Sequence, residues 1–321
     1  MNDIESNIPE LLPPLSDVVF SKIFESVDVS GVALKGIINA VLKDSKLPLI
    51  DEIVSVRSQS TQLGEVSARG CRIDVLAKDA EGQIFSIEVQ LERVVTINDR
   101  VLFNFGHIIQ NEIPKGARYE AFPKITMINI LGKDVRPEHP HFHHQAAVLY
   151  TDAPYEPATD NLTIHDIELP KFRAQLEREG KKFLDDNPLA LWLYVLDEGY
   201  KNPKFMEGVA QMDEGIRDFA SRYNIVASDK ELRHTYHNWL VGQMDRASEL
   251  FQAEKKGRQE GEAKGKAEGK AEGKAEGKAE GKAEGATHRS LEIARALISD
   301  GMSVEKVAAL TKLSAAEIAR L

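Results

Sequence analysis

The sequence predicts an α/β fold in which a mixed sheet carries helices on its faces and a helical extension follows. Two observations predict it. In the first 170 residues, segments with apolar residues at helical spacing alternate with short runs rich in β-branched residues. From about residue 171 to residue 256 only the helical spacing remains, as in PLALWLYVLDEG. At 321 residues, the chain is long enough to bury such a core.

The first region begins with two expected helices and an expected strand. In SDVVFSKIFE, Ser16 or Asp17 can begin a helix, and GVALKGIINAVLKD is a second amphipathic helix. The stretch IDEIVSVRSQS alternates as a strand does. The remaining expected elements are two strands within residues 71–92, a helix in TINDRVLFNFGHIIQNEI that ends at Pro114 and Gly116, and strands in KITMINILG, AAVLYTD and TIHDIEL.

Composition and charge bound the class of protein. The single cysteine, Cys71, allows no internal disulfide, which suits a reducing cytosol. No apolar run reaches the length of about 18 residues that a membrane helix needs, and the N-terminal stretch lacks the layout of a signal peptide. We therefore expect a cytoplasmic protein without a membrane partner. The net charge of −10 counts against a broad grip on nucleic acid, but it permits a local basic strip or carboxylates around metal ions.

A low-complexity spacer, residues 257–289, follows the helical extension of residues 171–256. A glycine recurs at every fourth residue from Gly257 to Gly285, with KAEG as the repeated unit. At this spacing Lys lies over Lys and Glu over Glu on a helix, and each Gly costs about 1 kcal/mol relative to Ala. We therefore expect a solvated segment that is partly helical or disordered. A glycine stripe for close helix association is the alternative.

The last segment, residues 290–321, predicts a small tail that resembles a helix-turn-helix. The first helix stops at Gly301, Ser303 can cap a second helix, and Ser314 can cap a third after a short turn. The last helix is short and carries one basic residue, Arg320. A helical hairpin that docks is favoured over a DNA-reading one, and both remain open.

The stretch CRIDVLAKDAEGQIFSIEVQLE predicts two antiparallel strands joined by a tight loop. A three-residue loop that ends at a left-handed Gly82 sets Val75 opposite Ile87 and Asp74 opposite Glu88. A one-residue slip would set apolar side chains against polar ones, so the pattern disfavours it. Alternation gives each strand an apolar face toward the core and a polar face toward solvent.

The opposed carboxylates indicate a metal site. Directly opposed side chains have Cβ atoms about 4.5–5.5 Å apart, and two carboxylates that close repel each other unless a proton or a cation lies between them. Oxygen ligands around an open site suit Mg²⁺ or Mn²⁺, which can activate water and neutralise charge on a phosphodiester. Gln90 points to the same side as Glu88 and could orient a water or a phosphate oxygen. The spacing alone favours the alternative, a solvated sheet face that carries acids.

Several segments together resemble a known nuclease family. An Asp, a turn and Glu-x-Gln on the next strand are similar to the PD-(D/E)xK nuclease core, with Asp74 and Glu88 in the acidic positions and Gln90 in the Lys position. More closely, the chain resembles the recombination-promoting nuclease and transposase family of bacteria. The similar segments are DVVFSKIFE, RIDVLAKDAEGQIFSIEVQ, RVLFNFGHIIQNEIPKGARYEAFPKITMINIL, IHDIELPKF, the glycine-rich spacer and LEIARALISDGMSVEKVAALTKLSAAEIARL.

The resemblance implies a PD-(D/E)xK restriction-endonuclease-like core over residues 1–170 and DNA cleavage that depends on Mg²⁺, with Mn²⁺ as a substitute. It implies Asp74 and Glu88 as metal ligands, and it adds Asp17 of the first helix as an accessory ligand or a structural residue. Gln90 departs from the superfamily's Lys, because an amide carries no positive charge near the attacking water. Gln is usual in this family, so the resemblance still implies activity.

A second class of function remains open. The nuclease core could be a scaffold, in a catalytically weak or inactive module that binds DNA or protein through its C-terminal helices. The acidic net charge and the missing Lys favour this alternative. In either case we expect the helical region to mediate self-association into a homo-oligomer or contact with a partner.

Three other features have weaker functional interpretations. The histidines of HPHFHHQ, residues 139–145, suggest zinc, but no third ligand is evident, and a solvated loop leading into a strand edge is favoured. Arg100 and Gln110 could touch phosphate from their helix, although ordinary helix-surface roles are favoured. Cys71 is expected on the apolar strand face as a buried residue.

Overall fold

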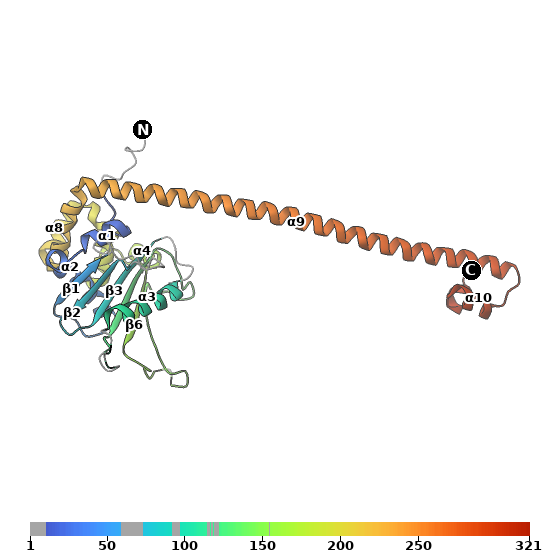
Figure 1. Ribbon diagram of the computed structural model, residues 1–321, viewed down its shortest axis with the longest axis horizontal. Coiled ribbons are helices and arrows are strands. Elements are labelled where there is room, and N and C mark those ends of the chain that lie inside the picture. The colour runs from blue at the N-terminus through green and yellow to red at the C-terminus, as the bar shows by residue number, and fades with distance from the viewer. Residues whose placement is uncertain are drawn as a thin grey trace, which may run out of the picture. The chain divides into compact units, whose positions relative to one another are not determined.

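A six-stranded mixed sheet forms the centre of the first of two compact units, residues 1–241 (Figure 1). The computed structural model describes residues 11–58, 73–91, 97–113, 116, 118, 122–153 and 155–321. The strand order is β1-β2-β3-β4-β6-β5, in which β3, β4 and β6 are parallel and the other neighbours are antiparallel. The strands are β1 (Ile53–Ser58), β2 (Val75–Asp79), β3 (Ile84–Gln90), β4 (Ile125–Leu131), β5 (His143–Ala147) and β6 (Leu162–Glu168).

Helices cover both faces of the sheet, so the structure confirms the predicted α/β fold with its helical extension. The helix α3 (Ile97–Glu112) packs on one face, and Figure 1 shows the others gathered mainly on the opposite side. These are α1 (Asp17–Ile23), α2 (Val27–Asp44), α4 (Leu169–Glu179), α5 (Lys181–Asp186), α6 (Pro188–Asp197), a 3₁₀ turn (Gly199–Lys201), α7 (Pro203–Met212), α8 (Glu214–Ser228) and the first turns of α9 (Lys230–Ser299).

Two apolar clusters hold these layers together. On the side of α1, α2, α6 and α8, the odd-numbered residues of β3 meet large buried side chains that include Phe20, Trp192 and Phe219. On the other side, Met127 of β4 packs with Val101 and Ile108 of α3. The sheet is therefore buried on both faces, as parallel sheets usually are, and every residue of β3 and β4 is buried.

Two local expectations differ from the structure, and two others fall on residues that it does not describe. The expected strand AAVLYTD is wrong in its bounds: β5 starts at His143, because the histidines pair with the edge of β6 and the ladder ends at Ala147. Ile73 was expected on the same face as Val75, but it packs in the α3 cluster, since the chain bends at Asp74 before β2 begins. Cys71 and Pro114 lie outside the described residues, so their expected roles are not addressed.

The glycine-rich spacer, expected to be partly helical or disordered, lies inside the continuous helix α9. Extending a helix costs far less than nucleating one, and Ala, Glu and Lys are good helix formers. Both ends of α9 are held by packing, through Leu232 and Tyr236 at its start and Ala294 near its end. Between them, all residues from 244 to 289 are exposed. Like charges lie four residues apart only within the KAEG units. Before these units, opposite charges such as Arg258 and Glu262 lie four residues apart and form an ion pair.

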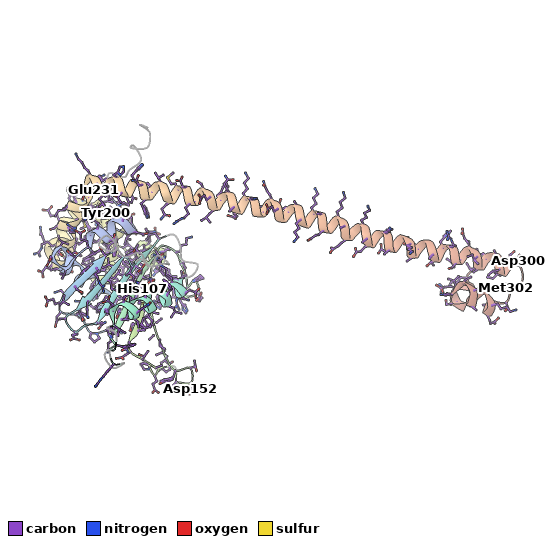
Figure 2. The ribbon with its side chains drawn as sticks, in the orientation of Figure 1. His107, Asp152, Tyr200, Glu231, Asp300 and Met302 are labelled. Carbon is purple, nitrogen blue, oxygen red and sulfur yellow. The ribbon has the colours of Figure 1, made fainter. Side chains whose placement is uncertain are left out.

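The second unit, residues 242–321, ends in a small helical tail. Gly301, with a φ of 82°, ends α9, and Figure 2 labels Asp300 and Met302 on either side of this turn. Ser303 is the N-cap residue of α10 (Val304–Thr311), and α11 (Ala315–Ile318) follows. Ser314 and Glu317 bond reciprocally as a capping box at the start of α11. A small apolar cluster, including Ala294, Val307 and Leu313, holds the three helices together.

The contact between α2, α6 and α8 gives a first testable prediction. A Cβ added at Gly36 of α2 would lie 2.7 Å from Cζ2 of Trp192, which is 1% exposed, and 3.3 Å from the backbone of Gly215. Gly36→Ala should therefore lower the free energy of unfolding by about 1–3 kcal/mol, through overpacking. Urea unfolding followed by tryptophan fluorescence measures the change.

Gly208 of α7 provides the matched control, because a Cβ there meets nothing within 4 Å. Gly208→Ala should leave stability unchanged or raise it by up to about 1 kcal/mol, since Ala is the better helix former. Equal unfolding midpoints for the two variants would contradict the packing of α2 on α6.

Candidate functional site

The hairpin of β2 and β3 has the predicted register. Val75 pairs with Ile87 and Ala77 with Phe85. Gly82 has a φ of 85°, the left-handed conformation that the loop requires. The ladder ends at Val75 and Ile87, and Asp74 and Glu88 are the next residues of the two strands at this end.

A backbone donor fixes the position of Asp74. One carboxylate oxygen, Oδ2, accepts a hydrogen bond of 2.8 Å from the N–H of Val89, across the end of the hairpin. The bond ties the bend before β2 to the C-terminal end of β3, so this carboxylate is held beside that of Glu88. Asp74 is 2% exposed.

Two side chains of α3, one helical turn apart, contact Glu88. Arg100 Nη2 lies 3.5 Å from Oε2, and Asn104 Nδ2 donates to Oε1 over 3.4 Å. Asn104 is buried, whereas the Arg100 side chain is 42% exposed. Each carboxylate oxygen of Glu88 thus has one donor from the helix that covers it.

The expectation of a polar face open to solvent is wrong for this hairpin. Glu88 is 2% exposed and Gln90 is 8% exposed, because α3 covers the face of the sheet on which they lie. This helix lies later in the chain, at Ile97–Glu112, and it reaches the sheet through Ile97, Val101 and Ile108. The solvated-pair alternative, which the spacing of the sequence favoured, is therefore excluded by the packing of an element that lies later in the chain.

Burial and the negative charge of neighbouring carboxylates raise the pKa of both carboxyl groups. Burial, and after it the charge of Asp17, raise the pKa of Asp74 to about 7, although the hydrogen bond from Val89 and the charge of Arg100 lower it. Burial and then the charge of Asp74 raise the pKa of Glu88 well above its ordinary value, and Arg100 lowers it. The two groups favour a shared proton or a cation over two uncompensated charges.

Asp17 and Gln90 lie in the same neighbourhood. Asp17 is the first residue of α1, and its charge acts on both buried carboxylates, so the fold brings the first helix to the end of the hairpin. Gln90 follows Glu88 on the same face of β3, and its Nε2 donates to the carbonyl of Val89 over 3.0 Å. All four residues singled out in the sequence therefore gather at one end of β2 and β3.

The donor set suits a divalent cation that shares its ligands with a substrate. Asp74 and Glu88 supply two adjacent buried carboxylates that repel each other, and Mg²⁺ is often held by one or two carboxylates together with substrate phosphates. A closed cage is absent: within the described part of the chain, no group of three or more His, Cys, Asp or Glu side chains could hold a metal ion. As metal ligands, the two carboxylates would form an open site that water or a phosphate completes.

The polar row across the sheet is longer than the sequence indicated. In register, Glu88 of β3 lies beside Asn129 of β4, and Asn129 lies beside Asp166 of β6. Asn129 Nδ2 donates to Asp166 Oδ1 over 2.8 Å, and both residues are buried. The available signal was a polar residue, Asn129 or Asp166, among the apolar residues of each strand. Asn104 carried no comparable signal, because its role depends on how α3 packs.

Of the histidine run, His143 lies on the face of the sheet away from the acidic pair, whereas His144 pairs in register with Asp166 of the polar row. His143 Nδ1 is 2.6 Å from Asp44 Oδ2, and His143 Nε2 is 3.0 Å from His165 Nδ1, on the face of the sheet opposite α3. His143 is thus a buried bridge between the end of α2 and β6, and not the solvated strand-edge residue that was expected. His139 and His141 are exposed. No zinc cluster occurs among the residues that are described.

The fold and the site define a class of protein: an α/β protein with a restriction-endonuclease-like core, in which two acidic residues meet at the end of a hairpin. Residues 14–253 match the model of the PD-(D/E)XK nuclease family transposases, and residues 288–321 match the C-terminal helix-turn-helix domain of the Rpn/YhgA-like nuclease family. The chain therefore belongs to the PD-(D/E)XK nuclease family transposases. It matches no curated protein and no solved structure.

No helix in the described part of the chain is both long and apolar enough to cross a membrane. The long helix α9 carries charged residues along its whole length.

The raised carboxyl pKa gives a prediction about stability. An unfolded Asp has a pKa of about 4, whereas that of Asp74 is about 7, so the folded protein binds more protons between these values. Stability without metal should therefore fall as the pH rises through this window. Asp74→Asn keeps the acceptor for Val89 and removes the charge. In EDTA at pH 8 it should melt at least about 3 °C above wild type, a difference that shrinks towards pH 5.

Asp152 supplies the control. It lies in an exposed loop that projects away from the sheet (Figure 2). Asp152→Asn should therefore have the same melting temperature as the wild type at each pH. Identical melting temperatures for Asp74→Asn and wild type at pH 8 would argue against an uncompensated buried charge at the site.

Proposed function

We propose that the protein is a metal-dependent DNA endonuclease that hydrolyses phosphodiester bonds and acts in bacterial recombination or transposition. The observation that carries the proposal is the buried pair of opposed carboxylates, Asp74 and Glu88, in a chain of this family. A strand pair with no chemical role has no reason to bury two acids face to face, because each loses its hydration. We expect the enzyme to act in the cytoplasm on DNA.

Each residue of the site has a separate role in this proposal. Asp74 and Glu88 would hold Mg²⁺, or Mn²⁺ in its place. The bound ion would activate a water molecule and neutralise charge on the phosphodiester. Asn104 and the N–H of Val89 hold the two carboxylates in place. Asp17 adds a third negative charge from α1 that acts on both carboxylates, and it would assist the site from outside the set of direct metal ligands.

Gln90 would position the attacking water or a phosphate oxygen. Its Nε2 is engaged with the carbonyl of Val89, which directs the amide and leaves Oε1 as an acceptor for water. An amide orients a water molecule without withdrawing its proton, so the residue has a positioning role in this proposal.

Nicking of supercoiled plasmid by the purified protein tests the proposal. Wild type should cut in Mg²⁺ and not in EDTA, and Asp74→Ala should lower the rate at least about a hundredfold, or roughly 3 kcal/mol of barrier. Asp17→Asn should have a smaller effect. Glu81→Gln, on the exposed turn of the same hairpin, should cut as wild type does.

Two results would defeat the proposal. One is the absence of cleavage by wild type in both Mg²⁺ and Mn²⁺. The other is equal cleavage by wild type and Asp74→Ala, which would place the activity elsewhere or in a contaminant.

A second candidate function is DNA or protein binding through the C-terminal helices, with a weak or inactive core. The match of residues 288–321 to a helix-turn-helix domain favours it. Self-association through the helical region of residues 171–256 remains a prediction under either function.

The tail offers a matched pair of variants for this second candidate. Val307 is fully buried in the tail, whereas Leu310 on the same helix is 65% exposed. If the tail binds DNA, Val307→Asp should weaken binding of a duplex at least about tenfold by unpacking α10, and Leu310→Ser should not. Binding is measured by fluorescence anisotropy, with Asp74→Asn as the background of both variants. The background protein alone also shows whether binding survives the loss of the Asp74 carboxylate. Unchanged binding by Val307→Asp would remove the tail from the DNA interface.

A further inference from the structure

Arg100 lies where the buried acidic pair meets solvent. It is the fourth residue of α3, and its Nη2 is 3.5 Å from Oε2 of Glu88. Its side chain is 42% exposed, whereas that of Glu88 is 2% exposed. The guanidinium therefore stands at the boundary that a phosphate arriving from solvent would meet.

Within residues 73–91 and 97–113, the described segments that form the candidate site, little other positive charge lies near the acidic pair. Gln90 occupies the position next to Glu88 on the same face, and its amide is neutral and turned to the carbonyl of Val89. Among the described residues, Arg100 is the cation whose charge acts on both Asp74 and Glu88. Its influence reaches the whole acidic pair, and not only the carboxylate that it contacts.

Asn104 shows by contrast that Arg100 does more than hold Glu88. A neutral amide one turn later already contacts the other oxygen of Glu88 from a buried position. Arg100 makes a longer contact than the 2.7–2.9 Å of a strong charge-assisted hydrogen bond, and it uses one nitrogen of a group with five N–H donors. The geometry leaves donors of the guanidinium for a second anionic partner.

We propose that Arg100 supplies the positive charge of this site and contacts the scissile phosphate of DNA. Gln90 cannot supply this charge, because its amide is neutral. The inference rests on the proposed nuclease function. A guanidinium matches two phosphate oxygens with two parallel N–H donors, and it keeps its charge at every working pH. Held at the rim by α3, it would stabilise the negative charge that develops on the phosphate during attack.

The test separates charge from position with three variants of the full-length protein. Arg100→Ala removes the side chain, Arg100→Gln keeps a stem and an amide for Glu88, and Arg100→Lys keeps the charge. Arg173→Ala is the control, since Arg173 is also a half-exposed arginine paired with a carboxylate, Asp197, but lies on α4 in the helical region. Melting curves in the same buffer show whether each variant is folded.

Two readouts are measured. The first is the salt dependence of binding to a fluorescent 20-base-pair duplex (about two helical turns) in EDTA, with Asp74→Asn as the background for all variants. Loss of one phosphate contact should reduce the slope of log K against log salt by about 1 in Arg100→Ala and Arg100→Gln, and not in Arg100→Lys or Arg173→Ala. The second is plasmid nicking, without the background substitution, which should fall about a hundredfold in Arg100→Ala and Arg100→Gln and recover in part in Arg100→Lys.

The outcomes separate this inference from the proposed function. A wild type that cuts no DNA would defeat the nuclease proposal, while the binding slope would still decide whether Arg100 contacts phosphate. An active wild type with unchanged slopes in all Arg100 variants would overturn the inference alone. Full recovery of slope and nicking in Arg100→Gln would also overturn it, because a neutral side chain that holds Glu88 would then be sufficient.

Discussion

The burial of two opposed carboxylates under α3 is the constraint on which the rest of this structure depends. Taking an ionised carboxylate out of water costs several kcal/mol unless donors or a cation compensate it. The fold provides a backbone N–H of β3 for Asp74 and two side chains of α3 for Glu88. These donors hold the geometry but leave the pKa of both groups raised. The site is thus kept at the expense of stability, as expected for groups that have a chemical task.

The topology of the sheet explains why the acidic pair is buried at all. β3 is a central strand with β2 antiparallel on one side and β4 parallel on the other, so both of its faces must be covered. One face meets the large core of helices, and α3 covers the other. The parallel register then continues the polar row from Glu88 through Asn129 to Asp166. Polar groups thus share one buried layer, where each needs a partner.

The acidic pair and the helix-turn-helix domain lie in different units of the chain. The acidic pair belongs to the first unit, and the helix-turn-helix domain belongs to the second, with the exposed part of α9 between them in the sequence. The net charge of −10 remains an obstacle to contact with DNA. A local cation can attract a phosphate even when the net charge of the protein is negative. The half-exposed Arg100 beside the acidic pair therefore matters for the proposed chemistry.

The sequence by itself determined the local features of this protein. Alternation and the glycine of the loop determined the hairpin register, and hence that Asp74 faces Glu88, because strand periodicity and turn geometry are local properties. Helical spacing determined most helices, although packing at both ends turned the expected spacer into part of α9.

Only the tertiary structure decided that the acidic pair is buried, that Asn104 and Arg100 contact it, and that His143 bridges Asp44 and His165. Each of these depends on which face of the sheet a distant element covers. That choice is made by the packing of the whole chain, and no short stretch of sequence encodes it.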